Sequence, residues 1–149
     1  MAIRTKSSKR SARPRRPAKP APPPADPRLE EGIALYNHRR FFECHEVLEQ
    51  AWLQTTGRDR DFYKGLIQAA VAFYHWSRRN PGGAMSLYRS SSRYLKRYTP
   101  AYLGVDVQSF LRRYTELFGW LRRHHLPYDP HLVPPIKKVS DTSQSGESV

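Results

Sequence analysis

The sequence is poor in cysteine, in acidic residues and in long apolar runs. Its single cysteine, Cys44, excludes an intrachain disulfide framework. No stretch reaches the run of about 18 apolar residues that a membrane-spanning helix requires. Only 13 Asp and Glu oppose 26 Lys and Arg, so the formal net charge is +13 at pH 7. The composition therefore argues against a disulfide-stabilised secreted scaffold and a membrane-spanning protein, and it predicts a strongly basic chain of one-domain length.

The first 25 residues differ from the rest of the chain. They contain eight Lys or Arg and six prolines, without one acidic or aromatic residue. Such a segment cannot bury enough apolar surface to offset the entropy of ordering, so we expect a disordered basic, Pro-rich tail over residues 1–25. Its prolines exclude the amphipathic helix of an organelle transit peptide, and it lacks the apolar core of a signal peptide. We expect residues 26–137 to form the folded domain, residues 138–149 to be disordered and the protein to be cytoplasmic.

Apolar residues recur at helical spacing along most of the remaining chain, and no segment shows the alternation of a strand. Two pairs of a capping residue and a proline, Asp26-Pro27 and Asn80-Pro81, mark helix starts, and Asp106 marks another. The segment from Phe62 to Trp76 is apolar on almost every side, as expected for a helix surrounded by others. These patterns predict an all-α fold, a compact bundle of about five helices followed by a docked proline-rich loop. The helices are expected to begin at Asp26-Pro27 and to span about 40–55, 59–79, 81–99 and 106–125.

Two of these helices each carry a pair of polar residues among apolar neighbours. His45 and Glu49 are four residues apart, so they lie one above the other on a helix. Gln68 and His75 are seven residues apart, about 20° from each other on a helical wheel. If the two faces meet, the four side chains converge on one point in the core. The rim of this cluster would hold Glu46 and Tyr74.

Three interpretations of the cluster are open. A network of His, Glu, Gln and His that satisfies itself would fix the register of the two helices. Two imidazoles and a carboxylate on facing helices also resemble a site for one divalent ion, Zn, Fe or Mn. The spacing matches neither the His-Glu-x-x-His zinc motif nor paired Glu-x-x-His di-iron motifs, so zinc-peptidase and ferritin chemistry are not indicated. The third interpretation is a metal-dependent hydrolase, with the ion on His45, Glu49 and His75 and with proton transfer by Glu46 or Tyr74.

No recognisable nucleophile or oxyanion site accompanies the cluster. Cys44 lies next to Phe41 and Leu48 in an apolar arc, which should raise the pKa of its thiol. We therefore expect an inert core cysteine, and catalytic residues stay unassigned.

Residues 32–98 contain three segments that together resemble a known family. They are, in order, GIALYNHRRFFECHEVLEQAW, FYKGLIQAAVAFYH and NPGGAMSLYRSSSRYLKRY. With its His-Glu-x-x-Glu, Gly-Leu-Ile-Gln and Asn-x-x-Gly-Ala motifs, this region is similar to the prokaryotic family catalogued as domain of unknown function 309. The resemblance implies an all-helical fold and a cytoplasmic bacterial protein, and it implies no activity. The family pattern falls on Phe42, Glu43, His45, Glu46, Glu49, Gly65, Leu66, Ile67, Gln68, His75, Asn80, Gly83 and Ala84.

The remaining clues concern partners. The basic tail can neutralise phosphates, which predicts weak, salt-sensitive binding of nucleic acid or another polyanion. A solubilising tail is the alternative, since no helix-turn-helix, RNA-recognition or zinc-finger motif accompanies it. Residues 32–52 also resemble one helical hairpin of the tetratricopeptide type, which hints at a partner-binding groove, and a homo-oligomer is a further option. The tail residues predicted to bind anions are Arg13, Arg15, Arg16 and Lys19.

These observations favour a small cytoplasmic helical-bundle protein of the binding or scaffold type. Its polar cluster either holds the core in register or coordinates one divalent ion. A metal-dependent hydrolase and a nucleic-acid accessory protein are the alternatives. Whether the protein is an enzyme stays open, with a binding role preferred.

Overall fold

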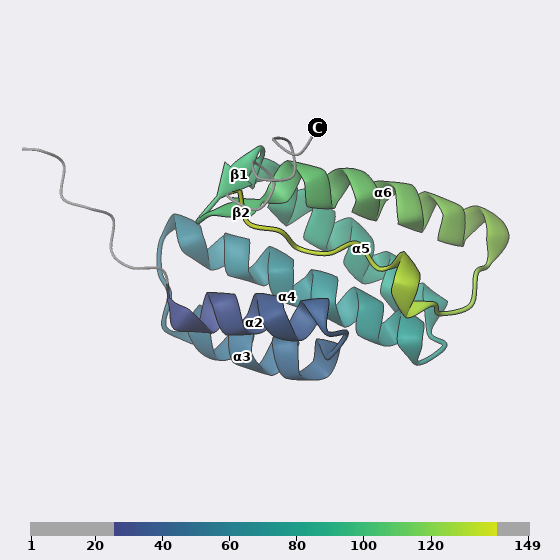
Figure 1. The fold of residues 1–149 in the computed structure, drawn as a ribbon, viewed down its shortest axis with the longest axis horizontal. Helices are drawn as coiled ribbons and strands as arrows, with labels where there is room; N and C mark the ends of the chain where they lie inside the picture. Colours follow the sequence, from purple (N-terminus) through teal and green to yellow (C-terminus); the bar gives the residue numbers. More distant parts are fainter. Residues whose placement is uncertain (1–25, 140–149) are drawn as a thin grey trace, which may run out of the picture.

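A computed structural model describes residues 26–139 of the chain. These residues form five α-helices, two short 3₁₀ helices and two short strands. The α-helices run along the long axis of the molecule and pack side by side (Figure 1). The predicted all-α bundle of about five helices is confirmed. The helices are α2 (Pro27–Asn37), α3 (Phe41–Leu53), α4 (Arg58–Ser77), α5 (Pro81–Leu95) and α6 (Val107–His124).

Three of the helices begin at the capping residues that the sequence indicates. The carboxylates of Asp26 and Asp106 and the side-chain oxygen of Asn80 each accept a backbone N–H from the first turn, at 2.9, 3.0 and 3.0 Å. Each of these bonds satisfies one of the donors that the first turn of a helix leaves free. Pro27 and Pro81 occupy the first helical positions, where a missing N–H costs nothing. Local sequence therefore sets where α2, α5 and α6 start.

Helix α4 is the central helix that the sequence predicts. It packs against α3 on one side and α5 on the other. It packs tightly against α5 at Gly65, where a Cβ atom would lie 2.7 Å from a methyl carbon of Leu95. No helix within residues 26–139 combines the length and the apolar character needed to cross a bilayer.

A small β-hairpin between α5 and α6 corrects the expectation of no strands. Strands β1 (Ala101–Tyr102) and β2 (Val105–Asp106) are antiparallel, with Ala101 opposite Asp106. The turn residues Leu103 and Gly104 both have positive φ, 47° and 78°, as the tightest hairpin turns require. Strands of two residues are too short to show an alternating pattern in the sequence.

The helix expected from residue 81 to about residue 99 is divided in two. Helix α5 ends at Leu95, and the 3₁₀ helix η1 (Lys96–Tyr98) continues it with a tighter winding. Tyr98 is still buried, and its hydroxyl donates to the carbonyl of Arg58 at 2.7 Å. The apolar stripe was therefore identified correctly, although its last turn is not α-helical.

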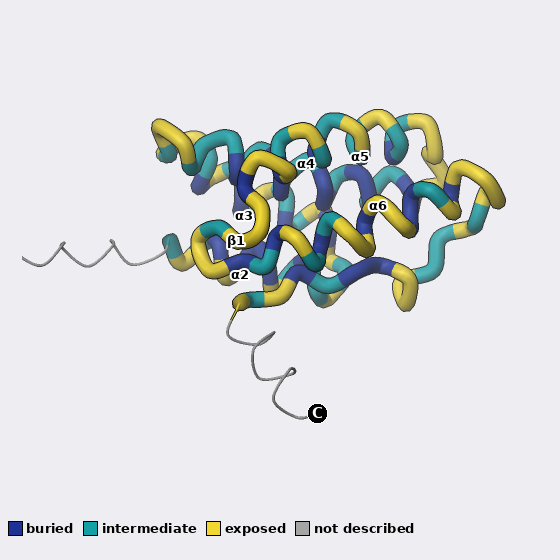
Figure 2. Tube along the Cα trace, turned by 90° about the horizontal axis from the view of Figure 1, so that it is seen from above, coloured by how far each residue is buried: buried dark blue, intermediate teal, exposed yellow. Residues whose placement is uncertain are grey.

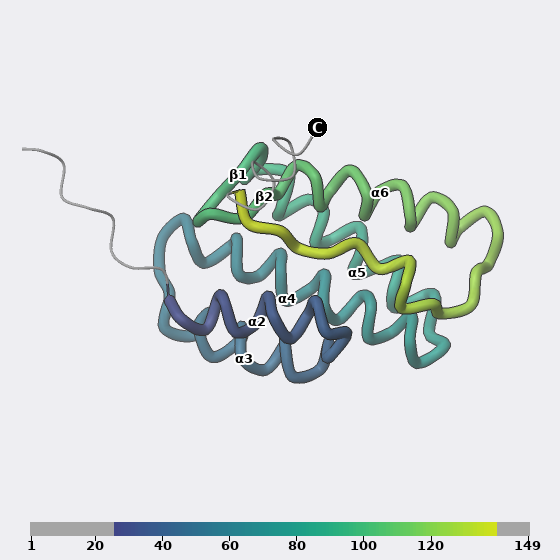
Figure 3. Tube along the Cα trace, viewed as in Figure 1, coloured from purple at the N-terminus to yellow at the C-terminus, as the bar shows by residue number. Residues whose placement is uncertain are grey.

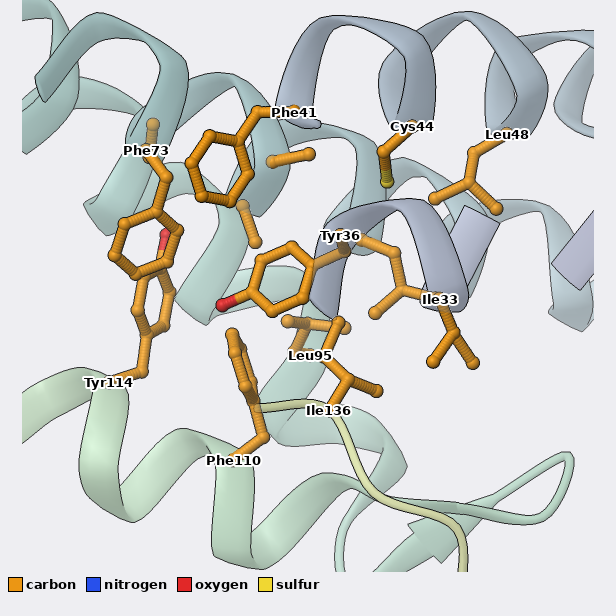
Figure 4. Close-up of a cluster of buried hydrophobic side chains, with 14 of the residues drawn as sticks. Ile33, Tyr36, Phe41, Cys44, Leu48, Phe73, Leu95, Phe110, Tyr114 and Ile136 are labelled. Atoms are coloured by element: carbon orange, nitrogen blue, oxygen red, sulfur yellow. The ribbon is translucent and has the colours of Figure 1, made fainter. Parts of the chain in front are cut away.

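The core is built on aromatic rings from four helices. Tyr36 of α2 lies with its ring centroid 5.5 Å from Phe41, 5.9 Å from Phe73 and 6.0 Å from Phe110, all edge to face (Figure 4). This is a favourable geometry for aromatic pairs. Buried and exposed positions alternate along α6, which turns its apolar stripe toward this core (Figure 2).

The segment after α6 returns along the bundle between α2 and α6 (Figure 3). It passes through the short helix η2 (Pro130–Leu132) and then becomes buried. The Tyr36 hydroxyl donates to the carbonyl of Pro134 at 2.7 Å. Asn37 both donates to the carbonyl of Ile136 and accepts its N–H, each at 2.9 Å. The proline-rich loop thus docks as expected and completes the core.

Candidate functional site

The four residues of the predicted cluster lie on α3 and α4, which pack against each other (Figure 1). All four keep part of their surface exposed. The expectation that they point into the core is therefore wrong, and they belong to the outer side of the helix pair. The apolar neighbours on the helical wheel gave the misleading indication, because Phe42 is itself 48% exposed.

His45 and Glu49 meet across one turn of α3. His45 Nε2 lies 2.9 Å from Glu49 Oε2. When Nε2 donates its proton to the carboxylate, Nδ1 of the neutral ring is an acceptor. Nδ1 is buried and has no hydrogen-bond partner among residues 26–139. One nitrogen of His45 is therefore bonded within the fold, and the other has an unused lone pair.

His75 makes a different contact, at the junction of α4 and α5. Its Nδ1 lies 3.1 Å from Nδ2 of Asn80, an amide donor, and the Asn80 side-chain oxygen accepts the N–H of Gly83 at 3.0 Å. A Cβ atom at Gly83 would lie 2.6 Å from Asn80 Nδ2 and 3.1 Å from the His75 ring, so a glycine is what this packing requires. We call His75, Asn80 and Gly83 the α4–α5 joint.

The donors that a metal site needs are not gathered. Within residues 26–139, no three His, Cys, Asp or Glu side chains come close enough to hold an ion. His45 and Glu49 form a pair, whereas His75 lies two helical turns beyond Gln68, about 10 Å along the helix axis. A helical wheel gives the direction of a side chain but not its height, and the predicted convergence neglected that height.

The segment that carries these features matches a known family. Residues 29–87 match the family model described as Domain of unknown function (DUF309). These residues form a DUF309 domain. The resemblance noted in the sequence is thereby confirmed, although the match ends at residue 87 rather than near residue 98. The matched residues cover most of α2, all of α3 and α4 and the first half of α5, and the match ends before α6.

One relative resembles part of the chain. It is the Uncharacterized protein YpuF of Bacillus subtilis (strain 168), which is 44% identical over 59 residues. The aligned residues are 39% of this chain and 34% of the relative, so the chain spans about a third of the length of the curated relative that it matches. The name of this relative states no activity.

The DUF309 domain also contains Trp52, near the end of α3. The Arg60 guanidinium lies 4.0 Å from the centre of its ring and the Lys64 ammonium 5.1 Å, both from α4. Cations over an indole are attracted by its negative face. Trp52 Nε1 is buried and finds no acceptor in the described part of the chain. Its spacing of seven residues from His45, on one side of α3, was the available signal.

A third buried polar atom without a partner lies on α4, beside α3. Gln68 lies one turn after Lys64 on α4, and its Oε1 is buried without a donor among the described residues. Phe42 lies 5.7 Å from the His45 ring and 5.7 Å from the Tyr74 ring, which joins the two helices at their other end. We call this surface the α3–α4 face. It comprises Phe42, His45, Glu49 and Trp52 of α3 and Lys64, Gln68 and Tyr74 of α4.

Helix α3 is an acidic helix in a basic protein. It contains Glu43, Glu46 and Glu49 but no Lys or Arg. Glu43 is paired with Arg40 at 2.6 Å, whereas Glu46 is exposed. The α3 edge of the α3–α4 face is therefore negative, which favours a cationic group there, whereas Arg60 and Lys64 make the α4 edge positive.

Cys44 shows that adjacent residues of α3 have opposite surroundings. It precedes His45, yet it is only 1% exposed, and its sulfur points into the core cluster (Figure 4). Burial raises the pKa of the thiol to about 12. The prediction of a core cysteine with a raised pKa is confirmed, and its lack of reactivity stays a prediction.

The predicted anion-binding residues of the tail lie outside the described residues. Their role therefore stays a prediction. They are Arg13, Arg15, Arg16 and Lys19.

Proposed function

We propose that this protein is a binding protein that takes up a basic polypeptide segment of a partner on the α3–α4 face. The observation that carries the proposal is a set of three polar atoms on this face that are buried without a partner in the described chain. They are His45 Nδ1, Trp52 Nε1 and Gln68 Oε1. An unpaired buried polar group costs about 1–3 kcal/mol, so a ligand toward which these side chains rotate gains affinity by supplying the missing partners.

A polypeptide backbone offers both kinds of missing partner. Its N–H groups suit the acceptors on His45 and Gln68, and its carbonyl groups suit the donor on Trp52. Phe42, which is 48% exposed, provides an aromatic anchor of the kind that dominates binding energy at interfaces. The negative charges of Glu46 and Glu49 favour Lys or Arg on the part of the partner that lies along α3, and Lys64 favours an acidic or carbonyl group along α4.

The metal-based alternatives have less support. A catalytic zinc site uses three protein ligands and an open position, whereas the α3–α4 face brings together the single pair of His45 and Glu49. The hydrolase hypothesis needs the same three ligands. A binding role therefore explains the arrangement with fewer additional requirements.

The experiment is a selection of displayed random peptides against the immobilised full chain. We expect the selected peptides to combine Lys or Arg with apolar residues. Their addition should shift amide resonances of α3 and α4 in ¹H–¹⁵N spectra. Phe42→Ala and Gln68→Ala should each weaken binding about tenfold, which corresponds to about 1.4 kcal/mol.

Leu132→Ala is the matched control, because Leu132 is exposed to a similar extent, 43% against 48% for Phe42, but lies on η2. Its affinity should equal that of the unaltered protein. Peptides that bind equally well to Phe42→Ala, or resonance shifts centred away from α3 and α4, would contradict the proposal.

Two further measurements test the competing hypotheses. Elemental analysis of protein purified without metal or chelator, beside a His45→Ala/Glu49→Ala double variant, tests the metal. Near-stoichiometric metal that disappears in the double variant would replace the peptide proposal by a metal site. Salt-dependent nucleic-acid binding, compared with a chain in which the four predicted tail residues are changed to Gln, tests the accessory role.

A further inference from the structure

A second feature, at the end of the bundle, is independent of the α3–α4 face. A cleft of about 790 Å³ opens where the end of α4, the start of α5 and the end of α6 meet residues 125–128. This volume lies within the range of about 300–1,000 Å³ that is typical of small-molecule sites. The floor of the cleft is made by buried apolar side chains. They are Trp76, Ala84, Phe118 and Leu121.

Contacts within the fold keep the walls of the cleft in place before any ligand binds. Trp76 Nε1 donates to the carbonyl of Leu126 at 3.0 Å, and its ring packs edge to face on Tyr128 with centroids 5.0 Å apart. Phe118 stacks on Tyr88 at 4.6 Å with nearly parallel planes. Since both the floor and the outer wall are fixed, a ligand entering the cleft pays little to order it.

The charges at the cleft are all of one sign. Arg79 and Arg122 line it and are exposed, and the described residues that line it include no Asp or Glu. Gly82, in the first turn of α5, belongs to the same wall. The start of a helix adds a partial positive charge to that of the arginines.

We propose that this basic cleft binds a small organic anion, an alkyl or aryl body that ends in a carboxylate or phosphate. The apolar floor would bury the body, and Arg79 and Arg122 would bind the anionic group at the mouth. Guanidinium groups suit this role, because their planar donors match the geometry of both anions. A nucleic acid fits less well, because it needs an extended basic track rather than an enclosed apolar floor.

The test uses three ligands with the same alkyl chain, decanoate, decanol and decylammonium, titrated into the full chain below their micelle concentrations. Binding is located by amide shifts in ¹H–¹⁵N spectra. We expect decanoate to bind most tightly and to shift residues of α4, α5 and α6 around the cleft. Decyl phosphate, with the same ten-carbon chain and measured alongside, distinguishes a preference for phosphate from one for carboxylate.

Charge and shape are then altered separately. Arg79→Gln/Arg122→Gln should lower the affinity for decanoate about tenfold and leave that for decanol unchanged. Arg89→Gln/Arg123→Gln removes the same charge from α5 and α6 outside the cleft and should have no such effect. Gly82→Leu should weaken decanoate and decanol alike. It should fold, because a Cβ at Gly82 meets nothing closer than 4.0 Å.

Three results would overturn the proposal. The first is decylammonium binding as tightly as decanoate. The second is an equal loss of decanoate affinity in the two double variants, which would indicate attraction by net charge alone. The third is a set of shifts that lie away from the cleft.

Discussion

His45 and His75 lie on neighbouring helices of one DUF309 domain, but their hydrogen bonds differ. His75 is bonded within the fold to Asn80, which also caps α5. His45 binds Glu49 through one nitrogen, and its other nitrogen is buried without a partner in the described chain. A histidine bonded inside the fold should contribute to stability, whereas one with an unused lone pair should contribute to binding.

Asn80→Ala should have the largest effect on stability at the α4–α5 joint. The variant removes both the cap of α5 and the donor to His75, so the free energy of unfolding should fall by about 1–2 kcal/mol. Urea denaturation followed by circular dichroism measures this change. Ser86→Ala, an exposed change on the same helix, should alter it by less than about 0.5 kcal/mol. Equal effects of the two variants would show that the joint is not a structural element.

Gly83→Ala and Gly82→Ala should act with opposite sign. A Cβ at Gly83 would lie 2.6 Å from Asn80 Nδ2, so the joint must shift. We expect a loss of about 1 kcal/mol, even though alanine favours a helix over glycine by a similar amount. At Gly82 the Cβ meets nothing closer than 4.0 Å, so only the helical preference remains and stability should rise. Two thermal unfolding curves decide this, and the same direction in both would contradict the packing at Gly83.

The direct comparison of the histidines uses His75→Ala and His45→Ala. His75→Ala should cost about 1 kcal/mol, the usual value of a hydrogen bond. His45→Ala should cost less than about 0.5 kcal/mol, because the side chain of its partner Glu49 is 45% exposed and such exposed pairs contribute little. Peptide binding should show the reverse order, with the loss confined to His45→Ala. If the same variant had the larger effect in both measurements, the two histidines would not have separate roles.

The reactivity of Cys44 tests whether α3 has one side in the core and one side outside it. With the pKa of its thiol raised to about 12, almost no thiolate exists at pH 8 in the folded protein. A disulfide reagent should therefore react no faster than the protein unfolds, and it should react at once in guanidinium chloride. Rapid reaction of the folded protein would place Cys44 on the outer side.

The helices could be predicted because their determinants are local. Apolar spacing and the capping residues Asp26, Asn80 and Asp106 act within a few positions of each helix start. The hairpin at residues 101–106 was missed, since two residues per strand carry no periodicity. The prediction of an inward-pointing cluster was wrong because a helical wheel omits two quantities. These are the position of each side chain along the helix axis and the exposure of the flanking Phe42.

The basic cleft could not be found from the sequence at all. Its lining comes from three helices and the loop at residues 125–128, so no short motif contains it. The unpaired atoms of the α3–α4 face were equally hidden, because the lack of a partner is a property of the packed structure. Residue type and spacing identified His45 and Gln68 as unusual, and only the packing shows which of their atoms lack a partner.

The hydrogen bond from Tyr36 to Pro134 joins residues that are 98 positions apart. A ribosome delivers the chain from its N-terminus, so α2 to α5 are made well before the segment that closes their core. Until Val133 and Ile136 arrive, the Tyr36 hydroxyl lacks its acceptor and the apolar side of α2 remains open. The nascent chain therefore carries an incomplete core through most of its synthesis, the kind of species that chaperones protect from aggregation.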